Sequence, residues 1–207
     1  MHPEVKRLIE VCAVDLAPWI REPIVEIGAR WADGQGDYAD LRPFFPGKRY
    51  IGVDLQAGPG VDVILERHPN CIRLALLDSD NQPATVLSVS TLEHDRDPWN
   101  TVQQVSRVIH KDGLVIATAP FHWPLHRHPA DYWRFSPEAM LLLFAAFDQR
   151  VAVWNEPADK PQDVALLALG VDGSDPAFIP AAKRAAARAG FPYWCTPEDD
   201  GCLPPRA

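Results

Sequence analysis

Cysteine is scarce in this sequence, and the few cysteines present do not group as metal ligands or disulfide partners usually do. The 207 residues include four cysteines, at Cys12, Cys71, Cys195 and Cys202. Only the last two are close together, and their spacing fits neither the paired ligands of a structural zinc site nor a dense disulfide framework. We therefore expect reduced thiols.

A long apolar run is also absent. Apolar residues recur at helical spacing over residues 4–20, but Glu10 and Asp15 interrupt them. The apolar core of a signal peptide contains no such acids, and a membrane helix needs about 18 or more apolar residues in succession. These features predict a cytoplasmic protein without a membrane span.

Positive charge is in deficit. Lysine and arginine total 20 against 28 aspartate and glutamate residues, which gives a formal net charge of −8. The basic residues also form no clustered stripe. Because affinity for a phosphate backbone comes largely from lysine and arginine, we expect no nucleic-acid partner.

The glycine fingerprint of dinucleotide-binding folds is missing as well. Gly28 follows an apolar run, but Arg30 stands two residues later, and the next glycines, Gly34 and Gly36, come too late for a G-x-G-x-x-G turn. A pyrophosphate needs several backbone N–H groups at a helix N-terminus. A nucleoside needs only a tight turn and a carboxylate for its ribose, so the sequence favours a nucleoside-type cofactor over a nicotinamide dinucleotide.

What the sequence does contain is an alternation of strand-like and helix-like segments. Strand-like runs cover residues 24–27, 49–55, 61–65, 84–90, 113–119, 151–154 and 164–170. Helix-like runs lie among them at residues 69–77, 98–109 and 137–144. This alternation predicts a parallel sheet with crossover helices in one globular domain. Ligands of such sheets bind outside the carboxyl ends of the strands, where Gly28 and Asp54 fall.

Several of these segments resemble the small, single-domain class I S-adenosylmethionine-dependent methyltransferases. The resemblance is carried by Glu26 and Gly28, Asp54, residues 61–66, residues 92–94 and residues 126–137, the last being similar to an H-x-x-P-x-D-Y-W-R-F-[ST]-P segment of one branch. It covers residues 22–170. It implies an α/β fold with a doubly wound, mostly parallel, seven-stranded Rossmann-like sheet and an antiparallel hairpin at one edge.

The resemblance also implies a division of the chain. Residues 1–171 form the S-adenosylmethionine-binding domain, in which residues 1–22 provide a lid helix over the cofactor side. Residues 172–207 change to an alanine-rich helix and a tail rich in proline, glycine and acids. We expect this segment to be appended outside the core. The oligomeric state is left open.

The expected cofactor is S-adenosylmethionine, held by groups at the strand ends. The candidate cofactor-binding residues are Glu26, Gly28, Asp54, Leu55, Glu66 and Ser90. Asp54 is the candidate ribose acceptor, and Glu26 is placed to bind the methionine ammonium through a charge-assisted contact. Two positions depart from the common pattern: Arg30 replaces a second glycine, and Glu66 replaces an aspartate.

Histidines follow the fourth and fifth predicted strands, at His94, His122, His126 and His128. Histidine serves as a general base near neutral pH and as a metal ligand. The latter three lie in a proline-broken loop without a second ligand set of recognised spacing, so we expect no metal. Capping of helices or a hydrogen bond to Asp131 is the alternative for some of them.

The implied reaction is in-line methyl transfer from S-adenosylmethionine to a small-molecule or glycan-type acceptor. The candidate catalytic residues are His126 and His94, with Asp131 orienting a ring or binding substrate. The candidate acceptor-binding residues are His122, Trp123, Tyr132 and Arg134. Arg30 leaves a second function open, that of an inactive methyltransferase-like protein that binds the cofactor or a partner.

Overall fold

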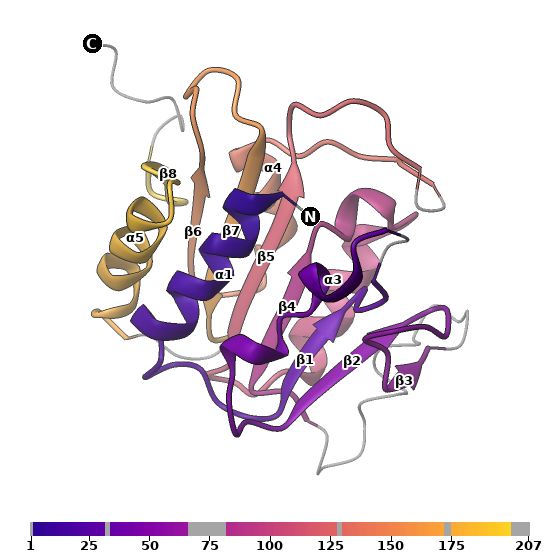
Figure 1. Ribbon diagram of the computed structural model, residues 1–207. Coiled ribbons are helices and arrows are strands. Elements are labelled where there is room, and N and C mark those ends of the chain that lie inside the picture. Colours follow the sequence, from indigo (N-terminus) through magenta and orange to yellow (C-terminus); the bar gives the residue numbers. More distant parts are fainter. Residues whose placement is uncertain (1, 32–33, 66–81, 128–129, 172–174, 200–207) are drawn as a thin grey trace.

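The computed structural model describes residues 2–31, 34–65, 82–127, 130–171 and 175–199 and has an eight-stranded sheet at its centre (Figure 1). The strands are β1 (Ile24–Ile27), β2 (Tyr50–Asp54), β3 (Val63–Ile64), β4 (Thr85–Val89), β5 (Leu114–Pro120), β6 (Gln149–Trp154), β7 (Asp163–Leu169) and β8 (Tyr193–Cys195). The helices are α1 (Pro3–Asp15), α3 (Pro98–Val108), α4 (Pro137–Leu143) and α5 (Phe178–Arg188), and the short 3-10 helices are η1 (Gly36–Ala39), η2 (Arg42–Phe44) and η4 (Leu92–His94). The predicted helix over residues 69–77 lies outside the described residues.

The strand order confirms the predicted doubly wound sheet. The order is β3-β2-β1-β4-β5-β7-β6-β8, and the neighbours from β3 to β5 are parallel. Strand β7 runs antiparallel between β5 and β6, which makes β6 and β7 the predicted hairpin. The direction in which strands are added reverses between β1 and β4. In open α/β sheets the ligand crevice lies at this reversal, outside the carboxyl ends of the strands.

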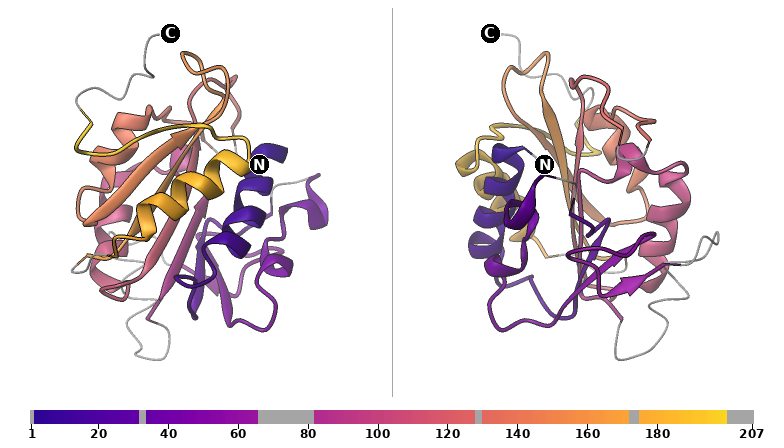
Figure 2. Two further views of the ribbon diagram at one scale, coloured as in Figure 1. Left: turned by 90° about the vertical axis from the view of Figure 1, so that its left-hand side faces the viewer. Right: turned by 45° about the vertical axis from the view of Figure 1, so that its right-hand side comes forward.

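Helices cover both faces of the sheet, α1 and α5 on one side and α3 and α4 on the other (Figure 2). Successive strand residues point to opposite faces, so Ile24 of β1 packs with α1 and α5 while Val25 packs with α3 and α4. Because both faces are covered, strands β5 and β7 are buried along their whole length. This double burial explains the continuous apolar runs of the sequence.

Helices α3 and α4 begin at the capping residues that precede the predicted helical runs. The side chain of Asp97 accepts a hydrogen bond from the backbone N–H of Asn100 (3.1 Å), and Ser136 accepts one from Ala139 (3.2 Å). In each helix proline follows the cap, where its missing N–H has no intrahelical partner to lose. These caps fix where α3 and α4 begin.

The segment after residue 172 was expected outside the core, but its described part lies inside it. Helix α5 buries Phe178, Ala182, Ala185 and Ala186 against α1 and the sheet, and β8 pairs antiparallel with β6. Alanine adds little hydrophobicity to a sequence profile, yet its small side chain lets a helix pack closely. The sheet therefore has eight strands instead of the predicted seven.

Residues 1–22 were expected to provide a lid helix over the cofactor side, but α1 packs on one face of the sheet. Helix α1 buries Val5, Leu8, Ile9 and Cys12 and packs against α5. Only its beginning reaches the carboxyl edge of the sheet, where the ring of His2 contacts Asp163 of β7. No helix in the described ranges is long and apolar enough to span a membrane.

The cysteines differ in part from the expectation of reduced thiols. Cys12 is a free thiol buried in α1, and burial raises its pKa to about 12, which makes it unreactive. Cys195 of β8 is disulfide-bonded, so for this residue the expectation was wrong.

Candidate functional site

The turns after β1 and β4 touch at the point where the sheet reverses. Gly28 has a φ of +77°, and its backbone N–H donates to the carbonyl of Val53 (2.9 Å). A Cβ at this position would lie 2.3 Å from Cγ2 and Oγ1 of Thr91. Both the positive φ and this close approach require glycine. Gly28, one of the predicted cofactor-binding residues, therefore lies where the ligand of such a sheet is expected to bind.

The carboxylate of Asp54 lies at the carboxyl end of β2, next to this turn. It accepts hydrogen bonds from the backbone N–H of Gln56 (2.9 Å) and of Arg30 (3.3 Å). These two bonds hold the carboxylate in place, and a carboxylate offers about four acceptor positions in all. Capacity therefore remains for two hydroxyl groups. Leu55, the next predicted cofactor residue, is 48% exposed beside it.

Glu26 lies one step deeper, within β1, with 8% of its surface exposed. It accepts a hydrogen bond of 2.7 Å from the hydroxyl of Tyr50. Burial raises the pKa of Glu26 to about 7, although the Tyr50 bond and the charge of Arg42 act in the opposite direction. This carboxylate is therefore close to its titration point at neutral pH, and a nearby cation would favour its charged form.

Ser90 is the first residue after β4 and has a φ of 49°, unusual for a residue other than glycine. Its backbone N–H donates to the carbonyl (3.1 Å) and to the side chain (3.0 Å) of Thr118 in β5. Such a conformation costs about 1–3 kcal/mol and is common at ligand sites. The remaining predicted cofactor residue, Glu66, lies outside the described residues.

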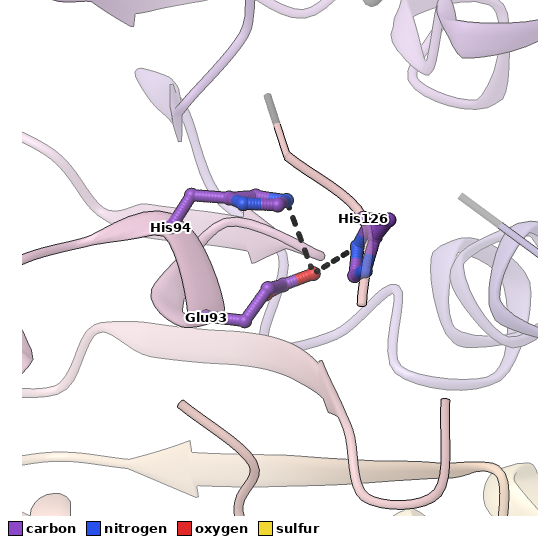
Figure 3. Close-up of side chains that lie close together, drawn as sticks. All are labelled: Glu93, His94 and His126. Carbon is purple, nitrogen blue, oxygen red and sulfur yellow. Dashed lines mark ion pairs between the residues drawn. The ribbon is translucent and has the colours of Figure 1, made fainter. Parts of the chain in front are cut away.

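Three polar side chains meet just beyond this turn, as Figure 3 shows: Glu93, His94 and His126. The first two belong to η4, and His126 comes from the loop after β5. Nε2 of His94 lies 3.7 Å from Oε1 of Glu93, and Nε2 of His126 lies 3.8 Å from the same oxygen. The Glu93 side chain is completely buried, whereas the two imidazoles are 16% and 26% exposed.

The loop after β5 is held against η4 by backbone hydrogen bonds. The carbonyl of Glu93 accepts from the N–H of Tyr132 (2.7 Å) and of Trp133 (3.2 Å). The indole N–H of Trp133 donates to the carbonyl of Asp95 (2.8 Å). Nδ1 of His94 is hydrogen-bonded to the carbonyl of Ala130. These contacts bring His126 and His94, which are distant in sequence, to one place.

Asp131 and Arg134 form an ion pair inside the loop after β5. The guanidinium of Arg134 binds both carboxylate oxygens of Asp131, one of them at 2.8 Å, and donates to the carbonyls of Trp123 and Pro124. The backbone N–H of His126 donates to Asp131 (2.8 Å). Arg134 holds the pKa of Asp131 well below its usual range. Asp131 therefore stays charged beside His126, and its role in orienting that ring stays a prediction.

His126 lies between two carboxylates. Its Nδ1 is 3.2 Å from Asp131 and its Nε2 faces Glu93. The Glu93 carboxylate first, and Asp131 after it, raise the pKa of His126 above its usual value. Glu93 was not assigned a role from the sequence, although it stands in the resemblance segment after β4. Its burial is the signal that sequence reasoning could not detect.

The predicted acceptor residues lie in the loop after β5 and differ in exposure. His122 is exposed, Trp123 is 37% exposed with its ring against that of His2 (4.0 Å between centroids), and Tyr132 is 46% exposed. Arg134 uses its donors to hold the loop. A substrate role for these four residues stays a prediction. His128 lies outside the described residues.

Comparison with known proteins supports the fold. The sequence matches no protein-family model and no curated protein. Among solved structures, a methyltransferase from Archaeoglobus fulgidus described as S-adenosylmethionine-dependent is 14% identical, with a TM-score of 0.57 over 79% of this chain and 94% of that one. The 1,6-didemethyltoxoflavin-N1-methyltransferase of Burkholderia thailandensis, solved with 1,6-didemethyltoxoflavin and S-adenosylhomocysteine, is 19% identical, with a TM-score of 0.51 over 80% and 79%. The CurJ carbon methyltransferase is 12% identical, with a TM-score of 0.50 over 71% and 48%.

At these identities the comparisons establish the fold alone. The chain has the Rossmann-like α/β fold of class I S-adenosylmethionine-dependent methyltransferases, as its sequence segments predicted. Fold does not by itself fix function, so the activity has to be argued from the site.

Proposed function

We propose that this protein is an S-adenosylmethionine-dependent methyltransferase that acts on a small-molecule or glycan-type acceptor. The observation that carries the proposal is the close contact of Gly28 with Thr91 where the strand order reverses. The carboxylate of Asp54, fixed by two backbone hydrogen bonds, lies beside it. The arrangement has a tight turn and a ribose acceptor but no glycine-rich pyrophosphate loop. A nucleoside cofactor without phosphates fits this chemistry.

In this proposal each strand end contributes one contact to the cofactor. Asp54 accepts the two ribose hydroxyls, Leu55 packs beside the nucleoside, and the Gly28 turn admits the chain that carries the sulfonium. Glu26 favours the methionine ammonium, whose positive charge stabilises the ionised carboxylate. Ser90 presents its turn to the same crevice. Glu66 keeps its expected role near the adenine.

Methyl transfer itself requires mainly alignment. The acceptor lone pair forms a bond to the methyl carbon while the sulfur–carbon bond breaks and its electron pair stays on sulfur, so no covalent enzyme intermediate is needed. An acceptor that carries a proton must also lose it. His126, oriented by Asp131, is the first candidate for this proton, and His94 is the second.

The acceptor class rests on the composition of the loop after β5. Trp123 and Tyr132 have exposed aromatic rings on which a planar ring or a sugar ring can stack. His122, just after β5, adds a polar group for a hydrogen bond to such an acceptor. The neighbouring structures do not narrow this choice, since one is named for a nitrogen acceptor and another for carbon.

Calorimetric titration of the purified protein with S-adenosylmethionine, S-adenosylhomocysteine and NAD tests the proposal. We expect the first two to bind with one site per chain and NAD to give no heat above dilution. Binding of NAD, or no binding of either sulfur compound to folded protein, would contradict the cofactor assignment.

One observation favours a second function, binding without transfer. Arg30 replaces a glycine of the common pattern, and its side chain packs closely against Gly58 in the β2–β3 loop, next to Asp54. A protein that binds S-adenosylhomocysteine but methylates none of a broad panel of phenols, amines and sugars would fit this alternative better.

A further inference from the structure

We propose that Glu93, His94 and His126 form a binding site for one divalent transition-metal ion, with Zn²⁺ as the ion to test. The sequence led us to expect no metal, because the loop histidines had no second ligand set. The fold supplies that set from η4. Two imidazole nitrogens and one carboxylate oxygen, donors that zinc accepts, lie within 4.8 Å of one another.

The spacing fits a shared ion better than direct hydrogen bonds. Both Nε2 atoms lie near Oε1 of Glu93, at 3.7 and 3.8 Å, beyond the 3.2 Å limit usual for N–H···O. Zinc–ligand distances of 2.0–2.2 Å place tetrahedral ligand atoms about 3.4 Å apart. Each carboxylate–imidazole separation would therefore have to shorten by a few tenths of an ångström to reach this value, and the two imidazole nitrogens lie within 4.8 Å of each other (Figure 3).

The Glu93 carboxylate is the second, independent observation. It is fully buried, and among the described residues neither of its oxygens has a hydrogen-bond partner. A buried carboxylate without a hydrogen-bond donor is costly, because it loses its hydration, and the ion pairs of Glu93 with the two imidazoles, at 3.7 and 3.8 Å, are longer than hydrogen bonds. Direct coordination of a cation removes that cost, and the buried position points the carboxylate at the two imidazoles.

Nδ1 of each imidazole, on the side away from Glu93, already lies next to an oxygen acceptor, as in a histidine that binds a metal through Nε2. Nδ1 of His94 faces the Ala130 carbonyl, and Nδ1 of His126 faces Asp131 and the Pro124 carbonyl. Carbonyl and carboxylate oxygens only accept, so each Nδ1 is the donor, and in the neutral ring Nε2 then carries the lone pair that faces Glu93. Metal-bound histidines are usually held in this way.

The effect on the reaction rests on the proposed function. Three protein ligands leave a coordination position for water or for an acceptor heteroatom, and the two imidazoles are the exposed part of the cluster. A hydroxyl bound there loses its proton to water more readily. Its oxygen then takes the methyl group, the sulfonium becomes a thioether, and one proton is released in all. With the ion bound, His126 acts as a ligand, so its role as a proton acceptor is confined to the metal-free protein.

The test uses the 207-residue chain, free of any histidine tag and stripped with a chelator, titrated with Zn²⁺ in competition with a chromophoric chelator. We expect one ion per chain with a Kd below about 1 µM. Glu93→Gln and His126→Ala should each weaken binding by at least about tenfold, and Asp131→Asn by about 10–100-fold, because it weakens the contact with Nδ1 that orients the His126 ring. His110→Ala, an exposed histidine after α3, is the matched control and should change nothing. Circular dichroism verifies the fold of each variant.

A Co²⁺ titration and a cofactor titration complete the test. Bound Co²⁺ should give a visible absorption spectrum, and the Glu93→Gln variant should change that spectrum. An excess of Mg²⁺ should not displace the Co²⁺. Zinc binding that is absent, or equal in wild type and Glu93→Gln, overturns the metal site. Titration of the same stripped protein with S-adenosylhomocysteine separates the two proposals: cofactor binding without zinc binding contradicts only the metal, and zinc binding without cofactor binding contradicts only the proposed function.

Discussion

Replacing Gly28 with alanine tests whether the turns after β1 and β4 touch in the way described. The new Cβ would lie 2.3 Å from the side chain of Thr91, at a φ of +77°. The positive φ costs about 1–2 kcal/mol, and forcing an extra methyl group into a packed contact costs about 1–3 kcal/mol. We therefore expect Gly28→Ala to lower the free energy of unfolding by about 2–5 kcal/mol.

Two further variants separate these causes. Gly47 has a φ of +74° and nothing within 4 Å of its Cβ position, so Gly47→Ala measures the backbone cost alone. Thr91→Ala in the Gly28→Ala background removes most of the clash and should recover about 1–3 kcal/mol. Urea denaturation of the four proteins gives the free energies. Equal losses for Gly28→Ala and Gly47→Ala, with no recovery from Thr91→Ala, would refute the close contact of the two turns.

Three other outcomes are expected. Asp54→Ala should lower affinity for S-adenosylmethionine at least tenfold in calorimetry, since each hydrogen bond to a charged acceptor contributes about 1.5–3 kcal/mol; unchanged affinity in a folded variant would remove the ribose assignment. His126→Ala should leave this affinity within about threefold, under about 0.7 kcal/mol, yet abolish most turnover of an acceptor once one is found. For Glu26, burial raises the pKa from 4.5 to about 7, so the folded protein keeps a proton that the unfolded chain loses. The corresponding stability is present below pH 4.5 and is lost, by about 3 kcal/mol, as the pH rises to about 7. Urea denaturation at pH 5 and pH 8 should show this loss in wild type and not in Glu26→Gln.

Local sequence patterns were sufficient for the parallel part of the fold. Strands β1, β2 and β5 are apolar and have glycine, proline or an acid at an end, and the caps Asp97 and Ser136 mark helix starts by chemistry that acts within four residues. Helix α5 was identified as a helix but placed outside the core. Its burial depends on α1, which comes some 160 residues earlier, and no local pattern contains that contact.

The site shows the same division. Gly28 and Asp54 were predicted because their positions at strand ends follow from the sheet alone. Glu93 was not, since a carboxylate in a turn is usually exposed, and only the docking of the loop carrying Tyr132 and Trp133 onto its carbonyl buries it. The placement of His126 next to His94 likewise depends on tertiary contacts, although both residues could be named as candidates.

The central claim is that the carboxyl edge of the sheet at the β1 and β2 turns binds S-adenosylmethionine, and a crystal structure of the complex with S-adenosylhomocysteine tests it most directly. We predict both ribose hydroxyls within hydrogen-bonding distance of the Asp54 carboxylate, the homocysteine chain passing Gly28, and the sulfur on the side of Glu93, His94 and His126. A complex in which the nucleoside lies away from Asp54, or in which the sulfur faces away from the histidines, would contradict the account.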